Sequence, residues 1–288
     1  MITASQLVAD VSIVPVTFHI HQPTFPLNLA VEKIIFYEGY SPPHHKERLL
    51  PDGGIDLVID LTQVPKNLYN NEDFGRYTSF KKSWISGIRR EFITIDAGQN
   101  SSMMVVRFRA GTASFLFKFP LHELADSVVE MDAIWGSDFL HLREHLLEQP
   151  TPEAKISTLE NWLLRHLRPE SEPHPVVGYA LGRIHQSPQL LTIADVQAKT
   201  GFSNKHFIHL FEKHVGTSPK TYLRTIKFQR VLAEIEKAKK IHWNDIVYSC
   251  GYYDQAHFIK EFRHFSGLNP TAYLAERGEY LNYIPVKG

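Results

Sequence analysis

Two histidines near the start of the chain have the spacing of a metal-binding strand. His19 and His21 are separated by one residue, so a β-strand would present both imidazoles on one face, where they could ligate a transition metal. A metal site of this kind also needs a glutamate a few residues later and a third histidine on the next strand pair. Residues 24–26 are Thr-Phe-Pro where the glutamate would stand. We therefore expect ordinary strand histidines, with no metal and no other cofactor.

Acidic side chains gather between residues 52 and 60, where a pair of carboxylates could act as general acid and base. Asp56 and Asp60 share one face of an extended strand, but the turn formed by residues 51–54 reorients Asp52, so a catalytic pair is unsupported. The favoured interpretation is a turn followed by a buried strand. Asp56 and Arg107 remain candidates for the lining of a ligand pocket.

Cys250 is the only cysteine, and its setting argues against nucleophilic chemistry. It lies just before a glycine turn on the expected core side of a helix, so we expect a packed thiol. The sequence contains no phosphate-binding loop, serine-hydrolase elbow or zinc-protease helix. We assign no catalytic residue. One alternative is an enzyme that acts on a small molecule through the N-terminal part, with the C-terminal part as an appendage. A second is an interaction module regulated by a partner protein.

Charge is distributed unevenly along the 288 residues, although the whole chain is neutral. Residues 174–288 contain 15 Lys and Arg against 9 Asp and Glu, so the rest of the chain is acidic by the same margin. A basic part joined to an acidic part indicates that one of them meets a polyanion. The chain lacks an apolar run of about 18 residues, and its first six residues lack the basic region of a secretory signal. We expect a cytoplasmic protein that does not enter a membrane.

The first 120 residues have the pattern of an antiparallel β domain, either a barrel or a sandwich. Turn signals such as the Pro-Asp-Gly-Gly at 51–54 separate short runs rich in β-branched and aromatic residues. These runs are residues 13–20, 31–37, 55–61, 92–95, 103–108 and 114–119. From about residue 121 the pattern becomes helical, with helices expected at 137–148 and 153–167. Prolines at 169, 173 and 175 predict an interdomain linker.

The C-terminal part contains an internal repeat, which is the strongest signal in the sequence. Asp195-Val196 matches Asp245-Ile246, and Gly201-Phe202 matches Gly251-Tyr252, both at an offset of 50 residues. After the turn the offset is 51: Phe207 matches Phe258, and each unit reaches a Gly-x-Ser/Asn-Pro stop. The stops are Gly216-Thr-Ser-Pro219 and Gly267-Leu-Asn-Pro270, each followed by Tyr-Leu.

Each repeat is predicted to be a helix-turn-helix. Thr192 suits the helix N-cap with Asp195 three residues later, and Gly201 and Gly251 suit a left-handed residue at the end of the first helix. The second helix has one apolar face, made in the first unit by Phe207, Leu210 and Phe211 and in the second by Phe258, Phe262 and Phe265. Two helices joined by a tight glycine turn form a DNA-reading motif.

The segment between the units, from Pro219 to about Lys237, is predicted to be one helix with proline in its first turn. Nineteen residues give a rod of roughly 28 Å. Successive major-groove faces on one side of B-DNA lie roughly 34 Å apart. A single chain could therefore hold two recognition helices in consecutive major grooves.

Residues 175–274 resemble the DNA-binding domain of the AraC/XylS family of bacterial transcription regulators. The resemblance rests on Gly201-Phe202-Ser203, on Phe211 followed by Gly216-Thr-Ser-Pro219, on the second unit's run from Cys250 to Phe258, and on Phe262 and Gly267-Leu-Asn-Pro270-x-x-Tyr273. One departure is visible: Gln197 and Val247 stand where the family usually carries alanine.

The resemblance implies that base-reading side chains lie near the start of the second helix of each unit. In the first unit these are Lys205, Ile208 and His209. In the second unit they are Gln255, Ala256, His257, Ile259 and Lys260. It also implies double-stranded DNA as the main partner, with RNA polymerase and a small-molecule effector as further partners. The acidic β domain and the helices from 137 to 167 offer apolar faces that could pair two chains into a homodimer.

The N-terminal part resembles, less specifically, a β-rich domain attached to some regulators of this family, through residues 49–58, Trp84-Ile-Ser-Gly87 and residues 106–111. The expected fold class is therefore α+β and multidomain. A β-rich, barrel- or cupin-like regulatory domain would occupy residues 1–130, and a helical connector and linker residues 131–173. An all-α domain of two helix-turn-helix units joined by a linker helix would occupy residues 174–288.

Overall fold

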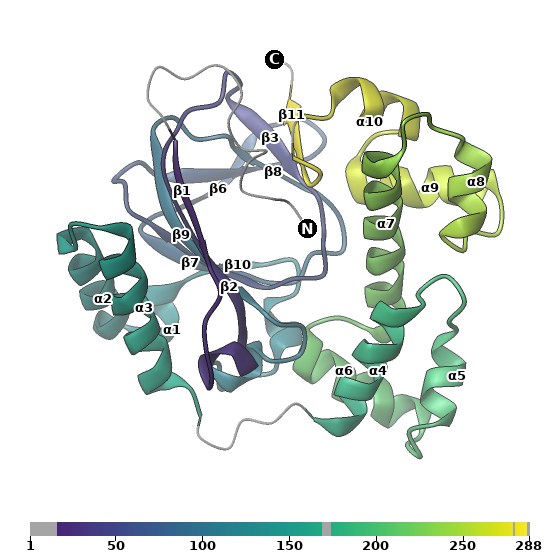
Figure 1. Ribbon diagram of the computed structural model, residues 1–288, viewed down its shortest axis with the longest axis horizontal. Coiled ribbons are helices and arrows are strands. Elements are labelled where there is room, and N and C mark those ends of the chain that lie inside the picture. The colour runs from purple at the N-terminus through teal and green to yellow at the C-terminus, as the bar shows by residue number, and fades with distance from the viewer. Residues whose placement is uncertain (1–15, 169–173, 279, 287–288) are drawn as a thin grey trace.

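The computed structural model describes residues 16–168, 174–278 and 280–286, so part of the first expected strand and most of the expected linker lie outside the described residues. Two antiparallel sheets form the N-terminal part, and helices form the C-terminal part beside it (Figure 1). The expected β-rich domain, helical connector and all-α domain are confirmed.

The first sheet has six strands, in the order β1-β2-β9-β4-β7-β10. Their bounds are β1 Thr17–His21, β2 Val31–Tyr40, β9 Ser101–Phe108, β4 Asp56–Asp60, β7 Ser83–Ser86 and β10 Val128–Glu130. The burial of β2 and β9 alternates along much of each strand, because one side of the strand faces the core. This sheet carries the largest share of the N-terminal apolar core.

The second sheet has five strands, in the order β11-β3-β8-β5-β6. Their bounds are β11 Tyr283–Val286, β3 Lys46–Leu49, β8 Ile93–Asp96, β5 Lys66–Tyr69 and β6 Arg76–Phe80. The edge strand β11 comes from the C-terminal tail, which the sequence pattern did not identify as a strand. It pairs antiparallel with β3, with Ile284 opposite Arg48, and the Ile284 side chain is fully buried. The tail therefore returns to the N-terminal domain after the last helix.

The expected strand at residues 114–119 is wrong. Residues Ala113–Phe115 form a short 3-10 helix, η3, and Phe115, Leu116 and Phe117 are all buried. Three consecutive buried side chains do not fit a strand that has one face in the core, because alternate residues of such a strand point to solvent. Two further short 3-10 helices, η2 (Leu27–Leu29) and η4 (Leu121–Leu124), complete this part of the chain.

Three helices follow the sheets and lie on the side of the N-terminal domain away from the C-terminal helices (Figure 1). They are α1 Met131–Trp135, α2 Ser137–Glu148 and α3 Pro152–His166. Thr151 caps α3 by accepting a hydrogen bond from the Ala154 amide, at 3.2 Å. The apolar faces of α2 and α3, which include Phe139, Leu142 and Leu159, are buried within the chain.

Seven helices form the described residues of the C-terminal part. They are α4 Pro175–Gln186, α5 Ile193–Ala198, α6 Asn204–Val215, α7 Pro219–Lys237, α8 Trp243–Ser249, α9 Gln255–Ser266 and α10 Pro270–Glu276. Thr192 caps α5 as predicted, and both turn glycines, Gly201 and Gly251, have positive φ (74° and 76°). Cys250 is fully buried, as expected.

Each helix-turn-helix unit shares an apolar core with the N-terminal domain. The first cluster joins the six-stranded sheet to Phe207 and Phe211 of α6, and the second joins Leu50 and Phe92 to the second unit. The glycines that end α6 and α9 lie at these contacts. A Cβ on Gly216 would stand 2.9 Å from Ile88, and a Cβ on Gly267 would stand 2.6 Å from Phe92. Both units are therefore docked on the stretch from residue 88 to residue 92.

The second core predicts a large stability effect at its centre. Phe262 is fully buried, and its ring lies 5.4 Å from Phe228 and 5.3 Å from Tyr273 between ring centroids. We expect Phe262→Ala to lower the free energy of unfolding by about 3–5 kcal/mol, because it leaves a cavity among packed rings. Denaturant unfolding measures this. Tyr253→Ala, at a ring that is 88% exposed, is the control and should stay within about 0.5 kcal/mol of wild type; equal losses in the two variants would contradict the assigned core.

Candidate nucleic-acid interface

The first candidate recognition helix is α6. Ser203 caps it by accepting a hydrogen bond from the His206 amide at 3.3 Å. Phe207, Leu210, Phe211 and Val215 point inward and are buried. On the opposite face Lys205 and His209 are exposed one helical turn apart, and Ile208 is half-buried beside them. The arrangement presents one cation, one imidazole and one apolar side chain near the start of the helix.

The second candidate recognition helix is α9. Asp254 caps it by accepting a hydrogen bond from the His257 amide at 2.7 Å. Five side chains predicted to read bases are exposed: Gln255, Ala256, His257, Ile259 and Lys260. The side-chain amide of Gln255 donates a hydrogen bond to the side-chain oxygen of Asn244 on α8, at 2.6 Å. This contact orients the Gln255 side chain at the N-terminal end of α9.

Aligning the two capping residues, Ser203 and Asp254, pairs two further exposed residues of α6 with residues of α9. Asn204 then matches Gln255, and His206 matches His257; both are exposed. The offset between the units changes from 50 to 51 residues at Tyr253, an extra residue in the second turn. That change fixes which residues are equivalent on the two helices.

An ion pair links α9 to the connector helix α7. Arg224 on α7 donates to both oxygens of Glu261 on α9, at 2.7 and 2.8 Å. Burial disfavours the Glu261 carboxylate, but the hydrogen bonds and charge of Arg224 outweigh burial and hold the pKa of Glu261 below its usual 4.5. The bidentate geometry orients the second recognition helix on the connector.

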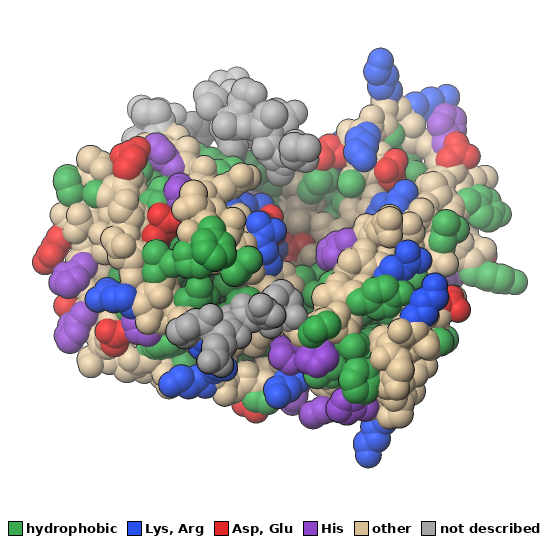
Figure 2. Space-filling model, turned by 60° about the horizontal axis from the view of Figure 1, so that its bottom comes forward, with side chains coloured by type: hydrophobic (Ala, Val, Ile, Leu, Met, Phe, Trp, Pro, Cys, Tyr) green, Lys and Arg blue, Asp and Glu red, His purple; other side chains and the backbone are tan. Residues whose placement is uncertain are grey.

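Lysine, arginine and histidine side chains lie on the surface of the C-terminal helices, on the right of Figure 2, with few acidic side chains between them. The net charge of this part of the chain matches the view, because its Lys and Arg outnumber its Asp and Glu by 15 to 9. A surface of this sign attracts the phosphate backbone of a nucleic acid.

The other candidate groups form contacts within the chain. Arg107 donates from Nε and Nη2 to Asp56 at 2.6 and 2.7 Å, and from Nη1 to Asp52 at 2.6 Å. All three guanidinium nitrogens are therefore engaged. His21 lies 2.8 Å from Glu160 of α3, and His19 lies 3.9 Å from Glu153.

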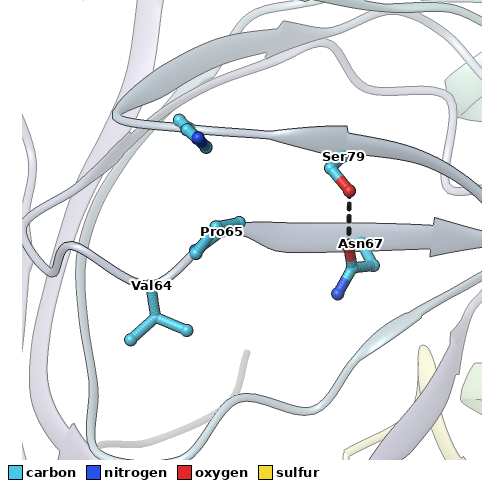
Figure 3. A pocket seen from close by; sticks show the side chains of 5 residues that line it. Val64, Pro65, Asn67 and Ser79 are labelled. Carbon is cyan, nitrogen blue, oxygen red and sulfur yellow. Dashed lines mark hydrogen bonds between the residues drawn. The ribbon is translucent and has the colours of Figure 1, made fainter.

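A surface hollow of about 550 Å³ lies beside β5 and β6, lined by Val64, Pro65, Asn67, Ser79 and Lys81. Two of these lining residues are hydrogen-bonded to each other: Ser79 donates to the side-chain oxygen of Asn67, at 2.6 Å (Figure 3). Neither Asp56 nor Arg107 lines it. Among the described residues, no group of three or more His, Cys, Asp or Glu is placed to hold a metal ion.

Two capped helix-turn-helix units on one connector define a DNA-binding architecture, and comparison with known proteins agrees with it. Residues 192–276 match the family described as a helix-turn-helix domain, and residues 19–130 match a domain of unknown function (DUF6597). An uncharacterized HTH-type transcriptional regulator, YtdP of Bacillus subtilis, is 20% identical over 250 residues, covering 78% of this chain and 32% of that protein. A regulator of the same description from Haemophilus influenzae is 32% identical over 71 residues, which are 25% of this chain and 24% of that protein.

The chain thus spans about a third or less of these curated relatives. Among solved structures, the C-terminal domain of the response regulator AraT from Geobacillus stearothermophilus is 22% identical, covering 37% of this chain and 89% of that one with a TM-score of 0.35. An apo form of ToxT from Vibrio cholerae is 9% identical, covering 88% of this chain and 98% of that one with a TM-score of 0.44.

Residues 192–276 therefore carry a helix-turn-helix domain, and the chain is similar to proteins described as HTH-type transcriptional regulators. The relatives that the chain matches are described as transcriptional regulators, which favours a regulator over the alternative of an enzyme with a helical appendage. None of the helices in the described residues is long and apolar enough to cross a membrane.

The Arg224–Glu261 pair predicts how stability depends on pH. Because folding lowers the pKa of Glu261, the pair contributes stability above pH 4.5, and that stability is lost as the pH falls through the lower folded value. With Arg224 about one-third exposed, solvent screens the pair, so we expect Glu261→Gln to cost roughly 1 kcal/mol at pH 7. Thermal unfolding of both proteins from pH 7 to pH 3 should show the gap closing below pH 4.5. A gap that stays constant with pH would contradict this assignment.

Proposed function

We propose that this protein is a sequence-specific regulator of transcription that reads two consecutive major-groove segments of double-stranded DNA with α6 and α9. The observation that carries the proposal is the geometry of the two units. Each recognition helix is capped and buries its apolar face, and each leaves a polar face free near its N-terminal end. A single 19-residue helix, α7, joins them.

We infer that α6 reads bases with Lys205, Ile208 and His209, all on its outward side. Lysine donates to guanine O6 and N7, and an apolar side chain packs on the thymine methyl group. On α9 the proposed readers are Gln255, Ala256, His257, Ile259 and Lys260. Glutamine can pair with adenine through two hydrogen bonds, and Gln255 is the first residue of its helix, where base edges are reached.

We infer that the N-terminal domain regulates this binding in response to a small molecule or a protein partner. Its cores continue into both helix-turn-helix units, so a change in the sheets would reach the reading helices.

The remaining expectations are also proposals. We place the protein in the cytoplasm with the chromosome, contacting RNA polymerase when it acts at a promoter. Residues 1–130, 131–173 and 174–288 are proposed as the regulatory, connecting and DNA-binding parts. A homodimer would use the outer surface of α2 and α3, where Leu147 and Leu164 are 39% and 40% exposed.

The base-reading assignment predicts a change of specificity. We expect Lys205→Ala and Gln255→Ala each to relax the preference at one base pair, in half-sites about ten base pairs apart. Each loss should cost roughly 1–3 kcal/mol of discrimination. Binding selections on randomised duplexes measure both motifs.

The controls are matched in chemistry. Lys81→Ala removes a lysine at an exposed position just after β6, and Gln186→Ala removes a glutamine at an exposed position of α4. Both control variants should return the wild-type motif. A lysine that touches only phosphate would weaken all sequences alike and lower the salt slope by about one. If both reader variants return the wild-type motif, these residues do not read bases.

The shared cores also predict the behaviour of the isolated reading domain. A fragment of residues 174–288 keeps both repeats and α7, but it loses the N-terminal partners of Phe207, Phe265 and Ile284. We expect it to fold, to unfold at a lower temperature than the whole chain and to bind a selected duplex more weakly. Calorimetry and fluorescence anisotropy test this; a fragment that is helical yet without DNA affinity at low salt would refute the proposed function.

A further inference from the structure

The loop between β3 and β4, residues 50–55, lies against one face of the connector helix α7. A Cβ on Gly53 would stand 3.0 Å from the Tyr222 ring and 3.5 Å from Ile226. Two residues earlier in the loop, the Pro51 carbonyl accepts a hydrogen bond from Gln229 at 2.8 Å. Residues 222, 226 and 229 are spaced i, i+4, i+7, so they form one stripe along the helix. The loop therefore follows α7 for two turns.

The Arg107 ion pairs hold this loop in shape. Asp56 begins β4 and Asp52 lies in the loop, and Arg107 of β9 bridges the two carboxylates. Asp52 also accepts a hydrogen bond from the Gly54 amide at 2.9 Å. A Cβ on Gly54 would stand 2.0 Å from Nη1 of Arg107, so the guanidinium lies directly over the loop backbone. Burial opposes the charge of Arg107, but the two carboxylates outweigh it and raise its pKa well above its usual value.

The residue just before the C-terminal strand β11 contacts both the 50–55 loop and α7. The side-chain oxygen of Asn282 accepts a hydrogen bond from Gln229 at 2.9 Å, and its carbonyl accepts one from the Leu50 amide at 2.9 Å. Strand β11 then continues along β3. Gln229 thus joins three segments: the connector helix, the 50–55 loop and the tail. Two turns earlier on α7, Tyr222 contacts His185 of α4 through its hydroxyl, at 3.0 Å.

We propose that the 50–55 loop is the element by which the N-terminal domain positions the connector helix, with Arg107, Asp52 and Asp56 as the positioning residues that shape it. The proposal rests on the DNA-reading function given above. The two aspartates and the arginine then position α7 by holding the loop in shape. We propose this role for Asp56 and Arg107 instead of the lining of a ligand pocket that the sequence suggested. Because α7 carries both reading units, its position against the loop fixes them both.

The loop also explains a sequence pattern that the helix-turn-helix function leaves unused. In the run Pro51-Asp-Gly-Gly-Ile-Asp56 the proline offers its carbonyl to α7, and the aspartates bind Arg107. The first glycine meets Tyr222, and the second leaves room for the guanidinium. Arg107 lies on β9, which pairs with both β2 and β4 in the six-stranded sheet. A shift in that sheet would move the loop and, with it, the connector.

Two variants of the full-length protein test the proposal. Gln229→Ala removes the donor to Pro51 and Asn282 without changing any residue of the recognition helices. Gly53→Val places a branched side chain against Tyr222 at a residue whose φ is 79°. Gln186→Ala, the same deletion as the first at an exposed position of α4, is the matched control.

We expect amide hydrogen exchange to become faster at residues 50–55 and 222–229 in both variants and to stay at wild-type rates in β2 and β9. Gln229→Ala removes two hydrogen bonds of the connector. We expect the affinity for a selected duplex to fall about fivefold in this variant, because the connector is no longer held in the binding geometry. The selected base motif should not change, since the reading side chains are intact. A lost contact that merely weakened the fold would instead speed exchange throughout the sheets.

Unchanged exchange at residues 222–229 in Gln229→Ala would overturn the proposal. So would a DNA affinity equal to that of Gln186→Ala, or one above wild type, which would mean that the contact opposes binding. If the wild-type protein binds no duplex, the proposed function fails, while the exchange experiment still decides whether the loop holds the connector.

Discussion

Burial of the connector helix α7 is the constraint on which the rest of the structure depends. Tyr222 and Leu223 at its start belong to the first apolar cluster, and Phe228, Val231, Leu232 and Ile235 farther along belong to the second. Each such side chain contributes roughly 1.5–3 kcal/mol when it leaves water. A helix of this length would be marginal alone, so these contacts are what make it rigid. One helix thereby joins the two reading units to each other and to the sheets.

The exposure of the recognition faces follows from the same packing. In α6 and α9 the phenylalanines turn inward against α7, so the opposite side of each helix must face solvent. Capping residues Ser203 and Asp254 fix where each helix begins, and the left-handed glycines Gly216 and Gly267 fix where each ends against the N-terminal domain. The polar side chains proposed to meet DNA thus stand on helices whose start is set by an exposed capping residue and whose end and rotation are set by buried contacts.

Local signals in the sequence were sufficient for the C-terminal domain, because its pattern is repeated. Capping residues, turn glycines and apolar spacing each indicate where a helix begins, where it ends or which face it buries, and each signal acts within about ten residues. The same signals occur in both repeats, so each repeat supports the interpretation of the other. The tail could not be assigned in this way. Four residues beginning at Tyr283 form a strand only because β3 offers a free edge more than 230 residues earlier, and such pairing leaves no local signature.

The contacts of the candidate ligand residues also could not be predicted from local sequence signals. Asp52, Asp56 and Arg107 were noticed as charged groups, but only their contacts reveal that they bind one another beneath α7. Residues 114–119 had the composition of a strand, but the chain forms the short 3-10 helix Ala113–Phe115 there and buries three successive side chains, Phe115, Leu116 and Phe117.

The central claim is that one chain reads two adjacent segments of one face of DNA. Hydroxyl-radical footprinting of the full-length protein on a selected duplex, with the stoichiometry of the same complex measured by native mass spectrometry, tests it most directly. We predict two protected segments about ten base pairs apart on one face of the duplex, in a complex that contains a single chain. A single protected segment for each bound chain would contradict it.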